Sequence, residues 1–301
     1  MSDSATQFIS EDKLDQRVRE LAILRAYTEA EYLSIKYSSY FDAYEELLSR
    51  YRGKPIVFIE VGVFHGGSLF MWRKFFGPDA RIIGIDLNPA AKKWEKYGFE
   101  IYIGNQADPD FWDGLFKLTG DVDVVLDDGG HANDQQIVTA VHCVPHIRDG
   151  GAMIVEDTHT SYFPRFGNPS NRSFISFAKT LIDSINARSP VARAKPSPLN
   201  RFIWSAAFYE SMVCFHVDRR KCFVSELISN RGATDEAVDF RYEDSALDKA
   251  IAKLNERAPR KGLLGRASAK FFGLAHYASS RLRSRKLAKY FQPGPNRTPA
   301  R

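Results

Sequence analysis

The sequence predicts an α/β fold in which a mostly parallel sheet carries helices on both faces. Five apolar runs, each about the length of a strand, are rich in β-branched and aromatic residues. These runs lie at 56–63, 81–87, 100–104, 122–128 and 152–158. Helical stretches are expected between them at 67–76, 89–97, 108–118 and 133–147. Continuous apolar strands that alternate with helices are typical of a parallel sheet covered on both faces.

Further elements flank this sheet. Apolar residues recur at helical spacing after Glu11, and the segment to Tyr51 is expected to be a helical cap. Another helix is expected at 171–187, and residues 202–217 have the pattern of two strands across a tight turn, which makes the final strand antiparallel. The chain thus divides into a helical N-terminal cap, a sheet domain and a basic C-terminal tail that is partly helical or disordered. We expect these parts at 1–54, 55–245 and 246–301.

Charge is distributed unevenly along the chain. The net charge is +5, but residues 258–301 contain eleven Lys or Arg and no Asp or Glu, which leaves −6 for the rest. The tail mixes Leu and Phe with its basic residues. It can form an amphipathic helix on an anionic membrane, remain a solvated tail, or contact nucleic acid. The acidic body and the lack of a motif that reads RNA or DNA argue against a nucleic-acid partner.

Composition excludes several classes of protein. Hydrophobic residues make up 44% of the chain, but no apolar run approaches the roughly 18 residues that span a bilayer. The polar, acidic N-terminus is unlike a secretory signal. Cys143, Cys214 and Cys222 form no CxxC pair, which favours reduced thiols. We expect a cytoplasmic protein, peripheral at the inner face of the membrane if the tail binds lipid. The sequence leaves open whether it forms a homo-oligomer.

A glycine-rich loop follows the first predicted strand. Residues Glu60 to Ser68 read E-V-G-V-F-H-G-G-S, with Gly62 and Gly66 where the strand turns into a helix. Glycines let a ligand approach the backbone closely, and a helix N-terminus favours negative charge. Asp86 ends the next strand, where a carboxylate can accept both hydroxyls of a ribose. The loop therefore indicates a nucleoside cofactor, or it is only a tight turn. It is not GxGxxG, which argues against an NAD-type oxidoreductase.

Carboxylates follow the fourth and fifth predicted strands. Neighbouring strands lie roughly 4.8 Å apart, so Asp128, Glu156 and Asp157 can converge on one point. Three hard oxygen ligands suit Mg²⁺ or another divalent cation better than zinc. Because consecutive strand residues point to opposite faces, Glu156 and Asp157 can both bind a metal only past the strand end. Asp127 is assigned to the cofactor side.

His131 stands three residues after Asp128, just before a predicted helix. An imidazole with an ordinary pKa of about 6.5 can take a proton from a substrate hydroxyl near neutral pH. Coordination to a metal would lower the pKa of that hydroxyl. Beside three carboxylates, we interpret His131 as a general base. The alternative is a histidine that only hydrogen-bonds its loop.

The pattern E-x-G-x-x-x-G-G-S followed by G-I-D resembles the first two motifs of Rossmann-like methyltransferases that use S-adenosylmethionine. In that family the glycine loop carries the methionine end of the cofactor, and the acid after the second strand binds ribose. The resemblance implies these roles for Glu60, Gly62, Gly66 and Asp86.

The stretch G-N-Q-A-D, which follows the third predicted strand, matches the position where that family meets the adenine. The resemblance therefore implies that Gln106 binds the cofactor. Asp108, two residues later, has the alternative role of N-cap for the next helix, which we favour.

A narrower resemblance lies in D-G-G-H, then E-D after the next strand and T-x-T-S-Y-F-P. These residues are similar to the metal-dependent sugar O-methyltransferases of macrolide and other glycosylated natural products, of the macrocin and mycinamicin type. In that group the residues that match Asp128, Glu156 and Asp157 hold Mg²⁺, and the match of His131 is the base. The resemblance covers roughly residues 30–220.

Two further features concern the acceptor. The loop from His159 to Arg172 carries Tyr162 and Phe163, which can stack on a sugar, and is expected to be a lid or an ordered surface loop. The sequence departs from the group at His159, at G-G-H in place of G-S-H, and near Tyr37, where a His is expected. We expect an O-methyltransferase that acts on a sugar hydroxyl. The alternative is a methyltransferase-fold protein with a non-sugar substrate, or a binding module associated with a membrane or nucleic acid.

Overall fold

The computed structural model describes residues 10–166, 171–192, 195–233, 246–258 and 262–287. The chain forms two compact units, residues 1–227 and 228–301, and each is described by itself. The N-terminal helices belong to the first unit together with the sheet. The boundary between the two units lies between residues 227 and 228.

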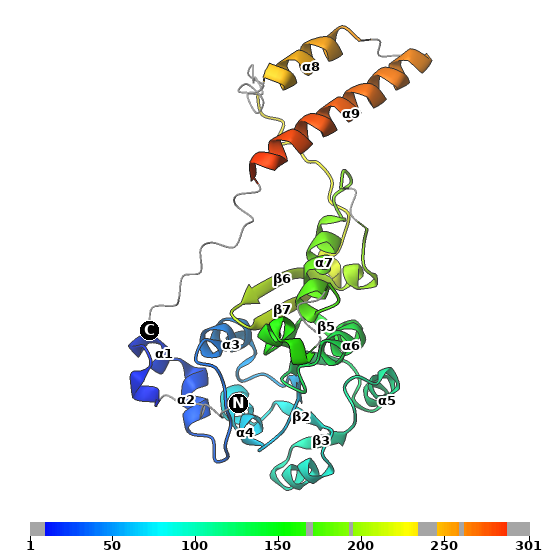
Figure 1. Cartoon of the computed structure of the whole chain (residues 1–301). Coiled ribbons are helices and arrows are strands. Elements are labelled where there is room, and N and C mark those ends of the chain that lie inside the picture. The colour runs from blue at the N-terminus through cyan, green and yellow to red at the C-terminus, as the bar shows by residue number, and fades with distance from the viewer. Residues whose placement is uncertain (1–9, 167–170, 193–194, 234–245, 259–261, 288–301) are drawn as a thin grey trace. The chain divides into compact units, whose positions relative to one another are not determined.

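Seven strands form one sheet in the order β3-β2-β1-β4-β5-β7-β6 (Figure 1). Their bounds are β1 Val57–Val61, β2 Arg81–Asp86, β3 Glu100–Ile103, β4 Val122–Asp127, β5 Ile147–Val155, β6 Ile203–Tyr209 and β7 Met212–Val217. The first five strands pair in parallel, whereas β7 runs antiparallel to both β5 and β6. The predicted mostly parallel sheet with an antiparallel final strand is confirmed.

Helices cover both faces of the sheet. In the first unit they are α1 Gln16–Arg19, α2 Ala22–Thr28, α3 Tyr40–Leu48, α4 Gly67–Phe76, α5 Pro109–Thr119, α6 Asn133–Cys143 and α7 Phe174–Asn186. The segment Pro89–Tyr97 is a 3₁₀ helix rather than an α-helix. The expected N-terminal cap is three short helices, and residues 29–39 between α2 and α3 are not helical.

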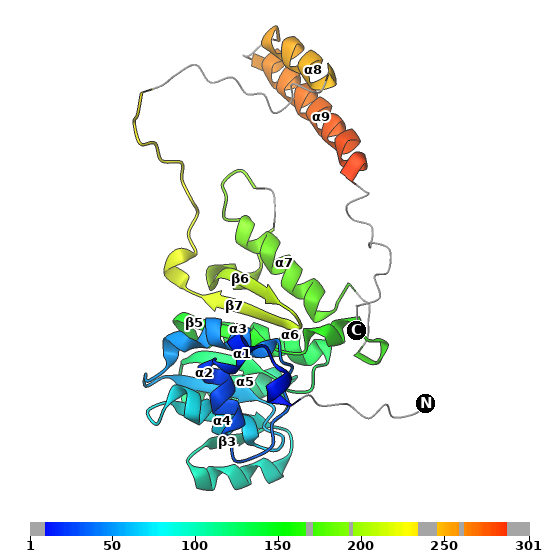
Figure 2. The same ribbon diagram turned by 90° about the vertical axis from the view of Figure 1, so that its left-hand side faces the viewer.

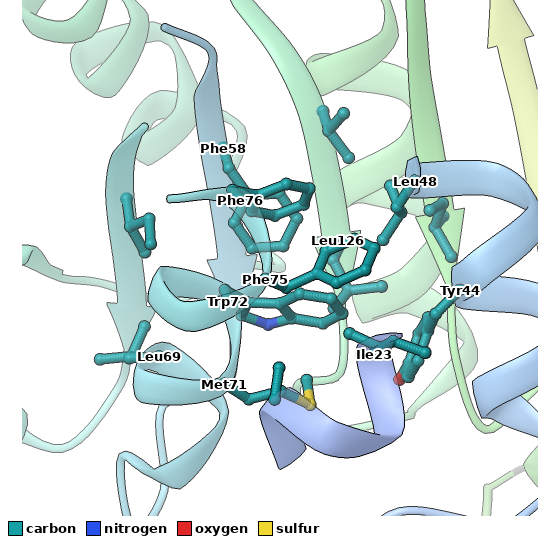
Figure 3. Close-up of a cluster of buried hydrophobic side chains, with 14 of the residues drawn as sticks. Ile23, Tyr44, Leu48, Phe58, Leu69, Met71, Trp72, Phe75, Phe76 and Leu126 are labelled. Carbon is teal, nitrogen blue, oxygen red and sulfur yellow. The ribbon is translucent and has the colours of Figure 1, made fainter. Parts of the chain in front are cut away.

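Two hydrophobic clusters pack against the two faces. One contains side chains of α2, α3 and α4, and the other contains side chains of α5, α6 and α7. In the first cluster, Trp72 stacks on Phe76 at 5.7 Å between ring centroids, and Tyr44 meets Trp72 edge-on at 5.1 Å (Figure 3). The cap is therefore part of the core, because α3 buries Tyr44 completely against the sheet helices.

The register places the carboxyl ends of the central strands at one edge of the sheet. Val61 of β1 pairs with Asp127 of β4, which pairs with Val155 of β5. On the other side, Val61 pairs with Ile85, one residue before Asp86 ends β2. In open α/β sheets ligands bind at this edge. The loops that carry the predicted site residues therefore start from neighbouring points.

The second unit contains α8 Ala246–Glu256 and α9 Gly262–Leu287, which lie alongside each other (Figures 1 and 2). The hydroxyl of Ser279 in α9 donates to the buried carboxylate of Asp248 in α8, at 3.1 Å. Among the described helices, α9 included, none is long and apolar enough to cross a membrane.

Candidate active site

The loop between β1 and α4 requires glycine at two positions. Gly62 has φ +91°, and a Cβ there would lie 2.1 Å from the carbonyl oxygen of Asp128. Gly66 has φ +80°, and its Cβ would lie 2.3 Å from the indole of Trp94. Both glycines accommodate a left-handed backbone and close packing within the protein. The tight-turn interpretation is therefore true of this loop, whether or not it also binds a cofactor.

Asp86 fixes the conformation of that loop. Its Oδ2 accepts hydrogen bonds from the backbone N–H groups of Val63 and Phe64, both at 3.0 Å. Its Oδ1 accepts from the N–H of Asn88 at 2.8 Å. Since a carboxylate offers about four acceptor positions, Asp86 retains capacity for a ligand hydroxyl. The side chain is half-buried at the edge of the sheet.

Glu60 lies beneath the loop and not at its surface. The carboxylate is fully buried and accepts from the hydroxyl of Ser68 at 2.8 Å and the indole of Trp72 at 3.0 Å. Burial raises the pKa of Glu60 to about 7. Its contacts join β1 to α4, so Glu60 supports the loop from beneath.

Gln106 and Asp127 belong to a buried network. The amide of Gln106 donates to Asp127 Oδ1 at 2.8 Å and to Thr139 at 3.1 Å, and its oxygen accepts from the N–H of Gly130 at 2.9 Å. Burial raises the pKa of Asp127 to about 6. Both side chains brace the loop after β4. Asp108 is confirmed as the N-cap of α5, through a 3.0 Å bond from the N–H of Asp110.

The acidic residues lie past the strand ends. Because β4 ends at Asp127 and β5 at Val155, the alternation of side chains along a strand does not separate Glu156 from Asp157. Asp157 has φ +54° and His131 has φ +58°. Left-handed backbone at residues other than glycine costs free energy and gathers at functional sites.

His131 and two of the predicted metal ligands form one group. The Nε2 atom of His131 lies 3.4 Å from Oδ2 of Asp157. Asp128, His131 and Asp157 each offer a ligand atom, and these atoms lie within 4.8 Å of one another. Opposite ligands of Mg²⁺ lie about 4.2 Å apart, since each bond is about 2.1 Å. The three ligand atoms would fit around a divalent cation once the distances between them shorten slightly.

Glu156 has different partners. It is fully buried, Tyr44 donates its hydroxyl to Oε1, and the ammonium of Lys36 lies 2.9 Å from Oε2. Both carboxylate oxygens thus accept hydrogen bonds from the N-terminal cap. The structure therefore does not bring Glu156 into the three-residue group with His131.

The cap supplies site residues that the sequence interpretation missed. Lys36 has 1% of its side chain exposed, and its ammonium also lies 2.6 Å from Asp128 Oδ2. Burial opposes its charge, but the carboxylates of Asp128 and Glu156 outweigh burial and hold the pKa of Lys36 well above its usual value. Tyr40 donates its hydroxyl to Asp157. Tyr40 and Tyr44 lie one helical turn apart, so the sequence could have indicated that their hydroxyls point from the same face of α3.

The structure describes residues 159–166 and 171–172 of the loop that was predicted to be a lid. Residues 158–166 form two short 3₁₀ helices, and 167–170 lie outside the described residues. Tyr162 and Phe163 have 59% and 45% of their surface exposed. Asn133 at the start of α6 donates to the carbonyl oxygen of Phe166 at 2.5 Å and thereby anchors the segment.

Comparison with known proteins agrees with this fold. Residues 59–158, which run from β1 to just past Asp157, match a family model described as a methyltransferase domain. This stretch is therefore similar to methyltransferase domains of the Rossmann-like class, in agreement with the predicted resemblance.

The curated relatives are sugar O-methyltransferases. The mycinamicin VI 2''-O-methyltransferase of Micromonospora griseorubida is 30% identical over 63% of this chain and 48% of its own length. The 8-demethyl-8-alpha-L-rhamnosyl tetracenomycin-C 2'-O-methyltransferase of Streptomyces olivaceus is 28% identical over 58% and 49%. The chain spans about half the length of these relatives. The solved structure of MycE with Mg, SAH and mycinamycin VI has a TM-score of 0.59 and 25% identity, and covers 76% of this chain and 58% of MycE.

Proposed function

We propose that the chain transfers a methyl group from S-adenosylmethionine to a hydroxyl of a sugar in a glycosylated small molecule. The observation that carries this proposal is the meeting of Asp128, His131 and Asp157 at the edge where Asp86 holds the glycine loop. A base, a cation site and a cofactor loop are the parts that a cation-dependent O-methylation needs. The acceptors named for the relatives supply the substrate class.

The cofactor would lie on the loop between β1 and α4. Asp86 is the group that we assign to the ribose, because it ends β2 and keeps free acceptor capacity. Gly62 and Gly66 allow the left-handed backbone and the close packing that give the loop its shape. Glu60, Gln106 and Asp127 would act from beneath by fixing the loops on either side.

Mg²⁺ or another divalent cation would be held by Asp128 and Asp157, and it would lower the pKa of an acceptor hydroxyl. Glu156 is the third predicted ligand. Its Oε2 becomes free for a cation only when Lys36 gives up the 2.9 Å contact. Tyr40 holds Asp157 from the opposite side and so orients its carboxylate toward the site.

His131 would remove the acceptor proton. Its Nε2 atom lies 3.4 Å from Asp157 Oδ2, so the negative charge of Asp157 would favour the imidazolium that forms. The oxygen would then attack the methyl carbon in line with the S–CH₃ bond, which would break and release S-adenosylhomocysteine. Positioning by the surrounding residues supplies most of the rate in such transfers. Tyr162 and Phe163 are exposed aromatic residues that can cover a sugar.

The proposal is tested with purified full-length protein, isotope-labelled S-adenosylmethionine and a panel of rhamnosylated and deoxysugar-bearing compounds. We expect label on a sugar oxygen, loss of transfer in chelator, and little transfer by Asp128→Ala. Full activity in chelator together with an unimpaired Asp128→Ala variant would refute the cation role.

We also propose that the second unit binds an anionic membrane surface. Leu264, Phe271, Leu274 and Leu282 of α9 are all more than half exposed and lie on one side of the helix at 100° per residue. The same helix carries Arg266, Lys270, Arg281 and Arg285, whose charge an anionic membrane attracts. We expect flotation of the full chain, but not of residues 1–257, with vesicles that contain phosphatidylglycerol. Equal flotation of both would contradict this proposal.

A further inference from the structure

Lys36 places a buried positive charge inside the candidate cation site. Its ammonium lies 2.6 Å from Asp128 Oδ2 and 2.9 Å from Glu156 Oε2, and only 1% of the side chain is exposed. It comes from the non-helical segment 29–39 between α2 and α3. A buried ammonium this close to two carboxylates is a direct partner of both.

The three carboxylates of the cluster need positive charge nearby. Tyr40 and Tyr44 donate neutral hydrogen bonds to Asp157 and Glu156, which satisfy oxygen atoms but add no charge. Buried carboxylates without a counter-charge are costly. When no cation is bound, Lys36 supplies that positive charge to Asp128 and Glu156.

A divalent cation at Asp128 and Glu156 would need the same oxygen atoms that Lys36 contacts. Two positive charges within a few ångströms repel each other strongly where water is excluded. Binding of the cation therefore has to displace the ammonium or tolerate its repulsion. Either event weakens the affinity of the site for the cation.

We propose that Lys36 is a built-in counter-ion that competes with the divalent cation for Asp128 and Glu156. This inference rests on the proposed function, because it concerns the same site. It has two consequences. The acidic cluster stays assembled when the cation is absent, and the protein binds its cation more weakly than the three carboxylates alone would allow.

The test compares Mg²⁺ binding to three full-length proteins by titration calorimetry, with and without S-adenosylhomocysteine. They are the unchanged chain, Lys36→Met and Tyr44→Phe. Lys36→Met removes the charge and keeps an apolar stem, whereas Tyr44→Phe removes the other donor to Glu156 without a change in charge. We expect Lys36→Met to bind Mg²⁺ about tenfold tighter or more, and Tyr44→Phe to stay within about threefold of the unchanged chain.

Thermal unfolding gives a second readout. Without Mg²⁺, we expect Lys36→Met to melt below the unchanged chain, because its carboxylates lose their counter-ion. Added Mg²⁺ should raise the melting temperature of Lys36→Met more than that of the unchanged chain. A variant that folds only with Mg²⁺ would also support the inference.

Mg²⁺ affinity in Lys36→Met that is equal to or lower than that of the unchanged chain would overturn the inference. So would the same Mg²⁺-induced rise in melting temperature for both proteins. Failure of the proposed function is visible separately. It would appear as lack of S-adenosylhomocysteine binding or of methyl transfer, whereas the Mg²⁺ comparison can still be read in the protein without cofactor.

Discussion

The Nε2 atom of His131 lies 3.4 Å from Oδ2 of Asp157, and both residues have left-handed backbone conformations. The hydroxyl of Thr160 donates to the carbonyl oxygen of His131 at 2.9 Å, which helps to hold the strained loop. The pair joins the loop after β4 to the loop after β5. The carboxylate of Asp157 therefore lies close enough to the imidazole to favour its protonated form.

Replacement of His131 tests the role of this pair. We expect His131→Ala to lower kcat by about 10²- to 10⁴-fold, the usual contribution of a general base, with little change in S-adenosylhomocysteine affinity. His142→Ala on α6 is the matched control and should retain activity. Transfer by His131→Ala at the rate of the unchanged chain would refute the assignment.

Asp86 is predicted to control cofactor binding. Asp86→Ala removes the acceptor for two loop N–H groups and, in our proposal, the partner of the ribose. We expect S-adenosylhomocysteine affinity to fall by about tenfold or more, as for loss of a charged hydrogen-bond partner. Asp79→Ala, at an exposed turn before β2, should bind normally by calorimetry. Equal affinities of the two variants for S-adenosylhomocysteine would show that Asp86 does not bind the cofactor.

Gly62 is predicted to be irreplaceable for steric reasons. Gly62→Ala combines positive φ with a 2.1 Å clash against backbone, whereas Gly98→Ala has similar φ and open space. The Gly98 variant should lose about 1 kcal/mol of unfolding free energy. The Gly62 variant should lose about 3 kcal/mol or more of unfolding free energy, because the backbone at Asp128 must shift to make room for the new Cβ. Denaturant unfolding measures both, and similar losses would contradict the clash.

The stabilisation that buried, protonated Glu60 gives the folded protein is predicted to be lost as pH rises. Burial raises its pKa from 4.5 to about 7, so the folded protein binds this proton more tightly than the unfolded chain does. The stabilisation is complete below pH 4.5 and is lost as pH rises through about 7. In denaturant unfolding at pH 5 and 8, the unchanged chain should lose roughly 3 kcal/mol more than Glu60→Gln over this interval. The same pH dependence in both proteins would contradict the raised pKa.

Sequence pattern was sufficient for the sheet and for the first four strands, whereas the predicted run 152–158 differs from β5, which spans Ile147–Val155. Apolar runs located β1 to β4 within one or two residues, because a parallel strand is buried on both faces. The loops after β4 and β5 then had to start side by side. For this reason Asp128, His131 and Asp157 could be placed together from sequence.

The partners of the site residues could not be predicted in this way. Lys36 contacts Asp128 and Glu156, which are separated from it by 92 and 120 positions in the sequence. Lys36 itself lies in a segment without regular secondary structure. Local periodicity carries no information on such a contact. The inward orientation of Glu60 and Gln106 also depends on tertiary neighbours, namely Trp72 and Thr139.

The central claim is that the chain methylates a sugar oxygen with the Asp128–His131–Asp157 site. The most direct measurement uses an extract of a strain that lacks the gene, because the unmethylated acceptor accumulates there. The purified protein is added with Mg²⁺ and S-adenosylmethionine that carries a deuterated methyl group, and products are analysed by mass spectrometry. We predict a deuterated methyl ether on a sugar, which is lost in chelator and in His131→Ala. Label on nitrogen, on carbon or on no product would contradict the claim.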